Sequence, residues 1–434
     1  MFLSNIKKVV GLSFIIIFGI LLTVSSVSAQ NVELDMWTFV DAHAEFYEMM
    51  ADSWNEENPD RTITLNTQVL PFNQMHDKLN IALQTGMGAP DIVDIEIGKF
   101  PGILENNADT LVDLTSTVDE YRDDILEARL APYSTSDSKV YGIPTHVGTY
   151  LMYYNVEMLE EAGVSIEDIE TWDDYLEAGK KVSKDTDGDG KKDQFMLAVP
   201  SEEASAFDGM SRQLGSNYFD EDGNVILDRE ENIRTLQRLR DFVYKHEIAD
   251  VVTDYHEQNF YNALNNEKYA SIFMPQWYMI RFTDFMPDLE GKIRVRPLPA
   301  WPNGEGTLST MGGGTGTAIT QEANDIELAK EFLAYAKLTR EAGVKIWTDL
   351  GFDPIVSDAY NDESFEQRFP YFGNEKVMLT IQELQSEIQP LYFSDLLTRL
   401  RDQLNEETLY EIFENGEEVE ENIREAAEKL RKEQ

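Results

Sequence analysis

The 434-residue chain contains no cysteine. This absence excludes disulfide bonds, thiolate metal ligands, thiol nucleophiles and a lipid attached through an N-terminal cysteine. Basic residues are also scarce, because 36 Lys and Arg stand against 81 Asp and Glu and give a formal net charge of −45. A surface of this sign repels phosphate groups, so nucleic acid and anionic lipid surfaces are not expected as partners.

Histidine is rare as well, with five residues in the chain. They are His43, His76, His146, His246 and His256. No two of them have the His-x-x-x-His spacing of a helical zinc site, and the chain has neither a Gly-x-Ser-x-Gly elbow nor a phosphate-binding loop. Metal-dependent and nucleophilic hydrolases therefore have no support. Paired carboxylates of a glycoside hydrolase stay open, because 81 acidic residues allow many pairings.

Long apolar runs are absent except at the N-terminus, where Lys7 and Lys8 precede an apolar run at residues 9–24. Small residues follow as far as Ala29, which is the pattern of a secretory signal peptide. The run is shorter than the roughly 20 residues that span a bilayer, which disfavours the alternative of an uncleaved membrane anchor. We therefore predict that residues 1–29 form a signal peptide cleaved after Ala29, and that the remainder is exported and soluble, periplasmic or extracellular.

The first part of the expected mature chain alternates between two hydrophobic periods. Period-two patterns predict strands at residues 32–36, 63–69 and 91–95, whereas helical spacing predicts helices at residues 44–57 and 75–85. A strand-helix-strand-helix-strand order is typical of an α/β fold with a largely parallel sheet. We therefore predict an α/β fold class.

A second unit begins with the apolar and aromatic strand predicted at residues 150–155. The chain is expected to cross between units near residues 146–149, and the Pro- and Gly-rich segment 297–316 is expected to carry a second crossing. At the C-terminus, a narrow apolar stripe over residues 419–430 predicts a helix that docks on the surface and exposes an acidic face.

An acidic loop at residues 185–193 has the ligand spacing of a calcium-binding loop. Four carboxylates occupy ligand positions, Gly190 supplies the sharp turn, and a backbone carbonyl follows it. Met196 stands where such a loop carries its bidentate glutamate, so the loop is incomplete, and a solvated turn is the alternative. We predict a structural calcium site. Its ligands would be Asp185, Asp187, Asp189, Lys191 and Asp193.

The six tryptophans divide by their sequence context. Those within or at the start of helical patterns are expected in cores, and they are Trp54, Trp172 and Trp347. The others follow predicted strands or lie in the Pro- and Gly-rich segment, and they are Trp37, Trp277 and Trp301. Ligands of open α/β sheets bind beyond the carboxyl ends of strands, so these three rings are candidates for stacking on a ligand. Gly313 and Gly314 offer backbone N–H groups for close approach to it.

Several segments in this order resemble a known family. They are Gly86–Val93, Tyr141–Pro144 followed by residues 151–155, Thr171–Asp173, the acidic loop, residues 288–299, Gly312–Thr315 and residues 328–333. Together they resemble the extracellular solute-binding proteins of ABC importers, in the carbohydrate-binding group that includes maltose-binding protein. The resemblance covers nearly all of the expected mature chain, but the lipid-anchoring cysteine of the family is absent.

This resemblance implies two α/β lobes that close over a sugar by hinge motion and deliver it to the permease subunits of an ABC importer. It implies a monomeric binding protein and not an enzyme. The N-lobe would comprise residues 30–147 plus about 300–335, and the C-lobe residues 148–299 plus about 336–434. The alternatives are an exported glycoside hydrolase and a binding protein for a non-sugar solute such as a polyol or peptide.

The resemblance also implies a set of ligand-binding residues. Matching segments follow the first and third strands, lie at the two lobe crossings, or form a late aromatic segment expected to face the cleft. The implied residues are Asp41, His43, Glu96, His146, Thr149, Trp277, Trp301, Gly313, Gly314, Tyr371 and Phe372, to which the strand-end position adds Trp37. Aromatic faces suit the apolar C–H faces of sugar rings, and carboxylates accept hydrogen bonds from sugar hydroxyls.

Overall fold

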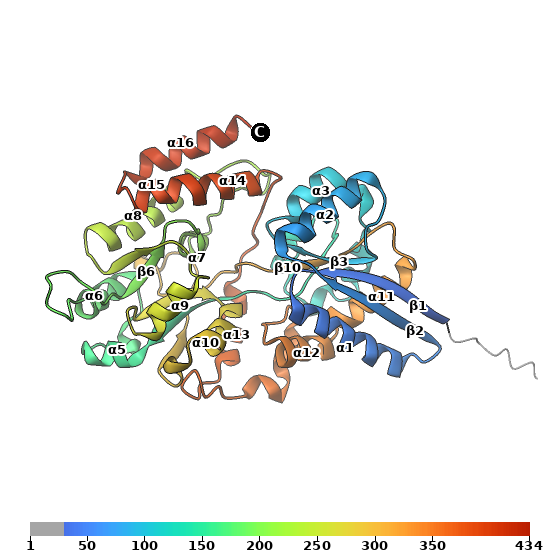
Figure 1. Ribbon diagram of the computed structural model, residues 1–434, viewed down its shortest axis with the longest axis horizontal. Coiled ribbons are helices and arrows are strands. Elements are labelled where there is room, and N and C mark those ends of the chain that lie inside the picture. The colour runs from blue at the N-terminus through green and yellow to red at the C-terminus, as the bar shows by residue number, and fades with distance from the viewer. Residues whose placement is uncertain (1–29) are drawn as a thin grey trace, which may run out of the picture.

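The computed structural model describes residues 30–434. The predicted signal peptide at residues 1–29 and its cleavage site lie outside the described residues. Figure 1 shows two lobes side by side, each with helices packed around strands, joined by extended segments of chain. The predicted two-lobe α/β fold is thereby confirmed. Across residues 30–434, none of the helices combines the length and the apolar character that a membrane crossing requires.

The N-lobe is built on one five-stranded sheet of order β2-β1-β3-β10-β4. Its strands are β1 (Gln30–Thr38), β2 (Arg61–Val69), β3 (Ile92–Glu96), β4 (Ile143–Pro144) and β10 (Thr315–Ile319). The first strand pairs in parallel with β2 and β3, as the alternating pattern predicts, whereas β10 runs antiparallel to β3 and β4. The sheet is therefore parallel at one side and antiparallel where the chain returns from the other lobe.

Six helices complete the N-lobe. They are α1 (Asp41–Glu57), α2 (Phe72–Thr85), α3 (Phe100–Asn107), α4 (Thr115–Asp119), α11 (Ile326–Lys337) and α12 (Arg340–Leu350). The buried face of α1 repeats at helical spacing through Phe46, Met50 and Trp54, and it packs against both α11 and α12. These contacts place α12 in the N-lobe, whereas the sequence assigned residues 336–434 to the C-lobe.

The C-lobe contains a three-stranded antiparallel sheet, β8-β5-β9, and a parallel pair, β6-β7. These strands are β5 (Tyr150–Asn155), β6 (Leu197–Pro200), β7 (Ala249–Val252), β8 (Ser271–Pro275) and β9 (Ile293–Arg296). The helices are α5 (Val156–Glu161), α6 (Trp172–Val182), α7 (Ser205–Gln213), α8 (Glu230–Tyr244), α9 (Gln258–Asn265), α10 (Met279–Phe285) and α13 (Val377–Leu384). Thr171 caps α6 in a reciprocal capping box with Asp174.

The chain ends in three further helices that pack on the C-lobe, α14 (Leu397–Gln403), α15 (Leu409–Phe413) and α16 (Val419–Arg431). A single π-helical turn, Leu404–Thr408, joins the first two. Val419, Ile423 and Leu430 are buried, and α16 packs against α8. This confirms the predicted docked helix. Figure 1 shows α14 reaching toward α3 of the N-lobe.

Two lobe crossings lie next to each other at residues 146–149 and 311–314. The N–H of Gly312 donates to the carbonyl of Gly148 at 2.9 Å. Residues 300–307 instead belong to the C-lobe, because the N–H of Trp172 donates to the carbonyl of Ala300 at 2.9 Å and the N–H of Thr307 donates to the carbonyl of Gln213 at 2.9 Å. The second crossing therefore lies within the predicted segment 297–316, but the N-lobe segment begins later than the predicted boundary at about residue 300.

A third crossing follows α12 and is fixed to the first through Asp353. The carboxylate of this fully buried residue accepts hydrogen bonds from the N–H groups of Gly148 at 3.0 Å and Thr149 at 2.8 Å. Burial raises the pKa of Asp353, and these two donors oppose that shift. Three chain segments thus meet in one hydrogen-bonded unit between the lobes.

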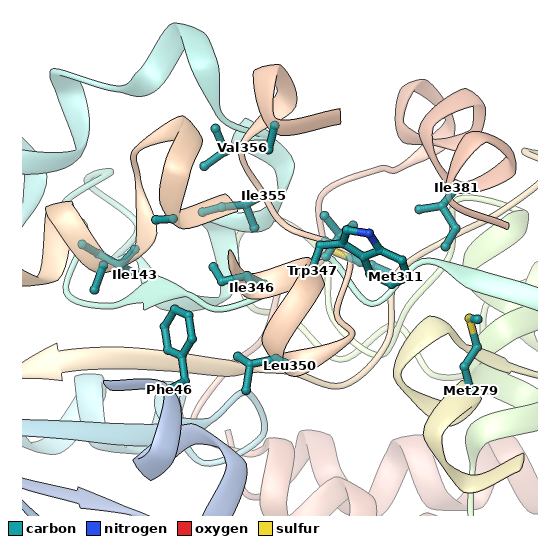
Figure 2. Close-up of a cluster of buried hydrophobic side chains, with 14 of the residues drawn as sticks. Phe46, Ile143, Met279, Met311, Ile346, Trp347, Leu350, Ile355, Val356 and Ile381 are labelled. Carbon is teal, nitrogen blue, oxygen red and sulfur yellow. The ribbon is translucent and has the colours of Figure 1, made fainter. Parts of the chain in front are cut away.

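One hydrophobic cluster runs beneath these crossings from lobe to lobe (Figure 2). It joins Ile346 and Trp347 of α12 with Met311 of the second crossing, Met279 of α10 and Ile381 of α13. Two further clusters stay within one lobe each, one behind the N-lobe sheet and one in the C-lobe. Apolar packing therefore joins the lobes on one side of the crossings, and the polar side chains at the strand ends do not belong to this cluster.

Candidate ligand-binding site

Four side chains gather at the carboxyl ends of the C-lobe strands, and we call them the C-lobe cluster. They are Glu203 after β6, Asp254 and His256 after β7, and Trp277 after β8. Since β6 and β7 are parallel, their carboxyl ends meet at one edge, and ligand atoms of Glu203, Asp254 and His256 lie within 4.8 Å of one another. The His256 ring stacks on Trp277 with centroids 5.8 Å apart and an interplanar angle of 22°.

Trp277 lies where the C-lobe meets the crossings. Its indole Nε1 donates to the carbonyl of Gly312 at 3.0 Å, and the side chain is partly exposed. Gly313 has φ +67°, and a Cβ at this position would lie 2.9 Å from the indole nitrogen, so the ring needs a glycine there. The structure thus brings two of the predicted residues, Trp277 and Gly313, into direct contact.

Glu203 is the acidic member with the most constrained surroundings. One oxygen accepts from the N–H of Tyr255 at 3.1 Å, and the other lies 3.8 Å from Nε2 of His256. Burial raises the pKa of Glu203, while His256 opposes that shift. The sequence analysis missed Glu203, Asp254 and His256. The position of Glu203 three residues after the apolar strand β6 is the signal that identifies it.

On the N-lobe side, Glu96 ends β3 as expected. Its Oε2 accepts from the N–H of Gly98 at 2.7 Å, and its Oε1 lies 3.7 Å from Arg401 of α14. Its own N–H points to Nε2 of His76 at 3.1 Å. Asp41 is exposed in the first turn of α1, where its negative charge interacts favourably with the positive end of the helix dipole. Both predicted acids therefore lie at strand ends of the N-lobe.

His43 has a different role from the one predicted. Its side chain is 2% exposed, and Nδ1 lies 2.9 Å from Oδ2 of the fully buried Asp94. Asp94 also accepts hydrogen bonds from the hydroxyls of Thr38 at 2.9 Å and Thr317 at 2.6 Å. Burial opposes the charge of Asp94, but the hydrogen bond from His43 and the nearby positive charges hold its pKa below the ordinary value. His43 thus belongs to a buried network, and its imidazole is enclosed by protein.

Lys337 of α11 completes this N-lobe network. Its buried ammonium donates to the carbonyl of Ile143 at 2.7 Å, to the hydroxyl of Thr145 at 2.9 Å and to the hydroxyl of Thr317. Burial lowers the pKa of Lys337 to about 7, and Asp94 opposes the shift. We call Asp94, His43, Thr317 and Lys337 the N-lobe network.

The two predicted glycines have a structural role that involves Arg129. This buried arginine donates from Nε to the carbonyl of His146 at 2.8 Å and from Nη2 to the carbonyl of Gly313. Gly314 has φ +125°, and a Cβ there would collide with the guanidinium. Within residues 30–434, Arg129 forms no ion pair with a carboxylate. Sequence analysis missed this residue, because no local pattern marks it.

His146 and Thr149 lie in the first crossing, as predicted, but both are buried. The His146 ring packs on Phe352 with centroids 4.7 Å apart, and burial together with Arg129 lowers its pKa well below the ordinary value. Across the described residues, neither ring nitrogen of His146 nor the hydroxyl of Thr149 has a hydrogen-bond partner. In this structure they belong to the interior of the crossings.

Two of the predicted stacking tryptophans are packing residues. Trp37 is buried behind the N-lobe sheet, with Nζ of Lys78 3.6 Å from its ring centroid. Trp301 is 2% exposed in the C-lobe core, and the guanidinium groups of Arg234 and Arg238 lie 5.1 and 5.2 Å from its ring. Neighbouring side chains therefore already cover the rings that a sugar would need.

The late aromatic segment is also part of the interior. The Tyr371 hydroxyl donates to the carbonyl of Met286 at 2.5 Å, and Phe372 is 1% exposed among Tyr153 and Phe282. Both rings pack in the cluster that runs between the lobes. The prediction that Tyr371 and Phe372 face the cleft is corrected, because their rings are enclosed by other aromatic side chains.

The acidic loop brings three of its predicted calcium ligands together. Ligand oxygens of Asp185, Asp187 and Asp193 lie within 4.8 Å of one another. Asp185 accepts from the N–H groups of Gly188 at 2.6 Å and Gly190 at 2.8 Å, and these bonds lower its pKa. Asp189 accepts instead from the N–H of Lys191 at 2.8 Å. The donor set is carboxylate oxygen, which suits Ca²⁺, and the site itself remains a prediction.

Comparisons with known proteins agree with this architecture. Residues 38–342 match the sequence model of the bacterial extracellular solute-binding protein family. The chain is 45% identical over 366 residues to the arabinooligosaccharide-binding protein of Halalkalibacterium halodurans, which covers 83% of this chain and 80% of the relative. It is 41% identical over 392 residues to the arabinooligosaccharide-binding protein of Bacillus subtilis, with 89% of each chain covered. Both relatives are named as binding proteins.

Solved structures show the same fold. The sugar-binding protein MalE from Xanthomonas citri aligns with a TM-score of 0.76 at 19% identity, covering 92% of this chain and 97% of that one. A binding protein from B. animalis subsp. lactis in complex with beta-1,6-galactobiose gives 0.72 at 22% identity, covering 92% and 96%. With the family match and the two close relatives, these likenesses lead to one conclusion: the chain belongs to the bacterial extracellular solute-binding proteins.

Proposed function

We propose that the protein binds an arabino-oligosaccharide between its lobes and delivers it to the permease of an ABC importer. The observation that carries this proposal is the C-lobe cluster, in which Trp277, Glu203, Asp254 and His256 lie together beside the crossings. The indole offers an apolar face for a sugar ring, while the carboxylates and imidazole exchange hydrogen bonds with hydroxyls. The names of the two relatives above 40% identity support the ligand class.

The crossings supply the movement that transport requires. Asp353 joins the first and third crossings, and Gly312 joins the second to the first, so bending at these few residues moves the lobes as bodies. A sugar that contacts both lobes binds the closed arrangement more tightly and shifts the population toward it. The permease then distinguishes the loaded protein by its shape.

We also propose how the protein is exported, its oligomeric state and its metal binding. Family membership supports export, and we propose that it occurs with cleavage after Ala29. We further propose that the mature protein is a monomer that binds neither nucleic acid nor anionic lipid, because its 81 acidic residues repel phosphate. Ca²⁺ at Asp185, Asp187 and Asp193 would stabilise the C-lobe without touching the sugar.

Titration calorimetry with arabino-oligosaccharides of increasing length tests the function, with malto-oligosaccharides as the comparison ligands. The proposal expects saturable binding of arabino-oligosaccharides, together with full recovery of the intact sugar after prolonged incubation. Shortened sugar products would indicate a glycoside hydrolase. Binding of malto-oligosaccharides alone would contradict the ligand class, and binding of neither would contradict the proposed function.

A further inference from the structure

Arg401 connects the C-terminal helices with the opposite lobe. Its helix, α14, is anchored in the C-lobe, where Leu397, Leu400 and Leu404 are buried in the C-lobe core. From the same helix, Nη1 of Arg401 lies 3.7 Å from Oε1 of Glu96 at the end of β3. The other arginine of α14, Arg399, pairs with Glu433 at 3.3 Å and so stays within its own lobe. The contact between Arg401 and Glu96 therefore depends on the relative position of the two lobes.

The N-lobe has room for this guanidinium because of Gly98. A Cβ at Gly98 would lie 2.6 Å from Nη1 of Arg401 and 2.8 Å from Oε2 of Glu96. The N–H of Gly98 also donates to Glu96 and orients its carboxylate. Phe393, which precedes α14, packs against the hydrophobic clusters of both lobes. The absence of a side chain at Gly98 and the packing of Phe393 thus allow α14 to approach the N-lobe beside the ion pair.

The charges around Arg401 favour the contact. Burial opposes the positive charge, but Glu96, followed by Tyr218 and Asp208, raises the pKa of Arg401 above its ordinary value. The side chains of Arg401 and Glu96 are 30% and 18% exposed, so solvent screens their attraction in part. Ion pairs of this kind change an equilibrium by about two- to fivefold.

We propose that Arg401 is a positioning residue, and that its ion pair with Glu96 holds the two lobes together across the side opposite the apolar cluster. The inference rests on the proposed function in one respect, since sugar entry requires the lobes to separate. Because the pair exists only while the lobes approach each other, it stabilises the closed arrangement and contributes nothing to the open one. The C-terminal helices thereby set how readily the protein closes, with or without sugar.

Spin labels test this proposal directly, because the chain has no native cysteine. Gln84→Cys on α2 and Glu421→Cys on α16 place labels on exposed helix positions in different lobes. Without sugar, Arg401→Glu in this background is expected to raise the ratio of long to short inter-label distances at least about two- to fivefold. The charge exchange Glu96→Arg with Arg401→Glu should restore the parent distribution. Arg399→Glu is the matched control, and it should leave the distances unchanged.

The result that overturns the inference is an Arg401→Glu distribution identical to that of the parent, or a charge exchange that fails to restore it. Melting curves identify variants that fail to fold, and in that case Arg401→Gln, which removes the charge without reversing it, takes the place of Arg401→Glu. A separate arm adds an arabino-oligosaccharide to the parent. If the sugar neither binds nor changes the distances, the proposed function fails, while the sugar-free comparison still decides the role of Arg401.

Discussion

Each lobe holds a group of polar and charged side chains, and the two groups differ in how far their neighbours enclose them. In the N-lobe, the buried His43 hydrogen-bonds with Asp94, Asp94 accepts from the hydroxyl of Thr317, and Lys337 donates to that hydroxyl and to a backbone carbonyl. In the C-lobe, Glu203 and His256 stay partly exposed beside Trp277, with ligand atoms close together. A polar residue near a strand end is available to a ligand only when its neighbours leave its hydrogen-bonding capacity and its surface free.

The largest expected effect comes from removing the acid of the N-lobe network. Asp94→Ala leaves the buried Lys337 without its nearby carboxylate and His43 without its partner, so we expect a loss of about 3–5 kcal/mol in the free energy of unfolding. Sugar affinity of the folded protein should be unchanged. Urea unfolding and calorimetry measure the two quantities. Asp41→Ala, at an exposed position, is the control and should stay within about 0.5 kcal/mol.

One result would contradict the contrast between the enclosed N-lobe network and the accessible C-lobe cluster. If Asp94→Ala abolished sugar binding while its unfolding curve matched that of the parent, the N-lobe network would itself be part of the binding site.

The same network predicts a dependence of stability on pH. The pKa of Lys337 is lowered from 10.5 to about 7 in the folded protein, so between these values the unfolded chain binds more protons. Stability should therefore rise from pH 7 toward pH 10 by at most about 1.4 kcal/mol per pH unit. Lys337→Met should flatten this slope in urea unfolding measured across that range. Equal slopes in the parent and the variant would show that folding does not lower the pKa of Lys337.

The two tryptophans that follow C-lobe strands sharpen the comparison within one lobe. Trp277→Ala removes a partly exposed ring and should weaken sugar binding by about 2 kcal/mol, roughly thirtyfold, with little loss of stability. Trp301→Ala removes a ring enclosed by Arg234 and Arg238, so stability should fall and affinity should not. Calorimetry measures the sugar affinity of both variants, and melting curves measure their stability. An exchange of these two outcomes would reverse our assignment of the rings.

The acidic loop gives the smallest expected effect. Its carboxylates lie at the surface and hydrogen-bond with the loop's own backbone, so we expect the loop to fold without a cation. Ca²⁺ at ten times its dissociation constant should add about 1.4 kcal/mol to the stability of metal-free protein. Asp193→Asn should abolish this gain, as measured by melting with and without Ca²⁺. If Ca²⁺ does not change the melting temperature of the verified metal-free parent, the predicted site is contradicted.

Hydrophobic period and chain order were sufficient to predict most of the fold. The strands at residues 30–38 and 150–155 and the docked helix at 419–431 follow local patterns that the structure confirms. The second crossing lies within the predicted segment 297–316, but the lobe boundary at about residue 300 was placed too early, because residues 300–307 pair with α6 and the end of α7, which are distant in sequence. No local pattern carries that information.

The site was less predictable for the same physical reason. Trp277 and Trp301 both follow strands, and what separates them is the covering of Trp301 by two arginines of α8. Likewise, Arg129 reaches the crossings from a segment without a recognisable motif, and only its contacts with Gly313 and His146 reveal its place. Sequence identifies a candidate edge for ligand binding, whereas tertiary packing decides which side chains remain exposed there.

One measurement tests most directly that sugar binds at the C-lobe cluster. Incorporating 5-fluorotryptophan gives one fluorine NMR signal for each of the six tryptophans, which single Trp→Phe variants assign. On titration with an arabino-oligosaccharide, our account predicts the largest saturable shift for Trp277 and little change for Trp301, whose ring is enclosed. A saturable shift at Trp301 with Trp277 unmoved would contradict it.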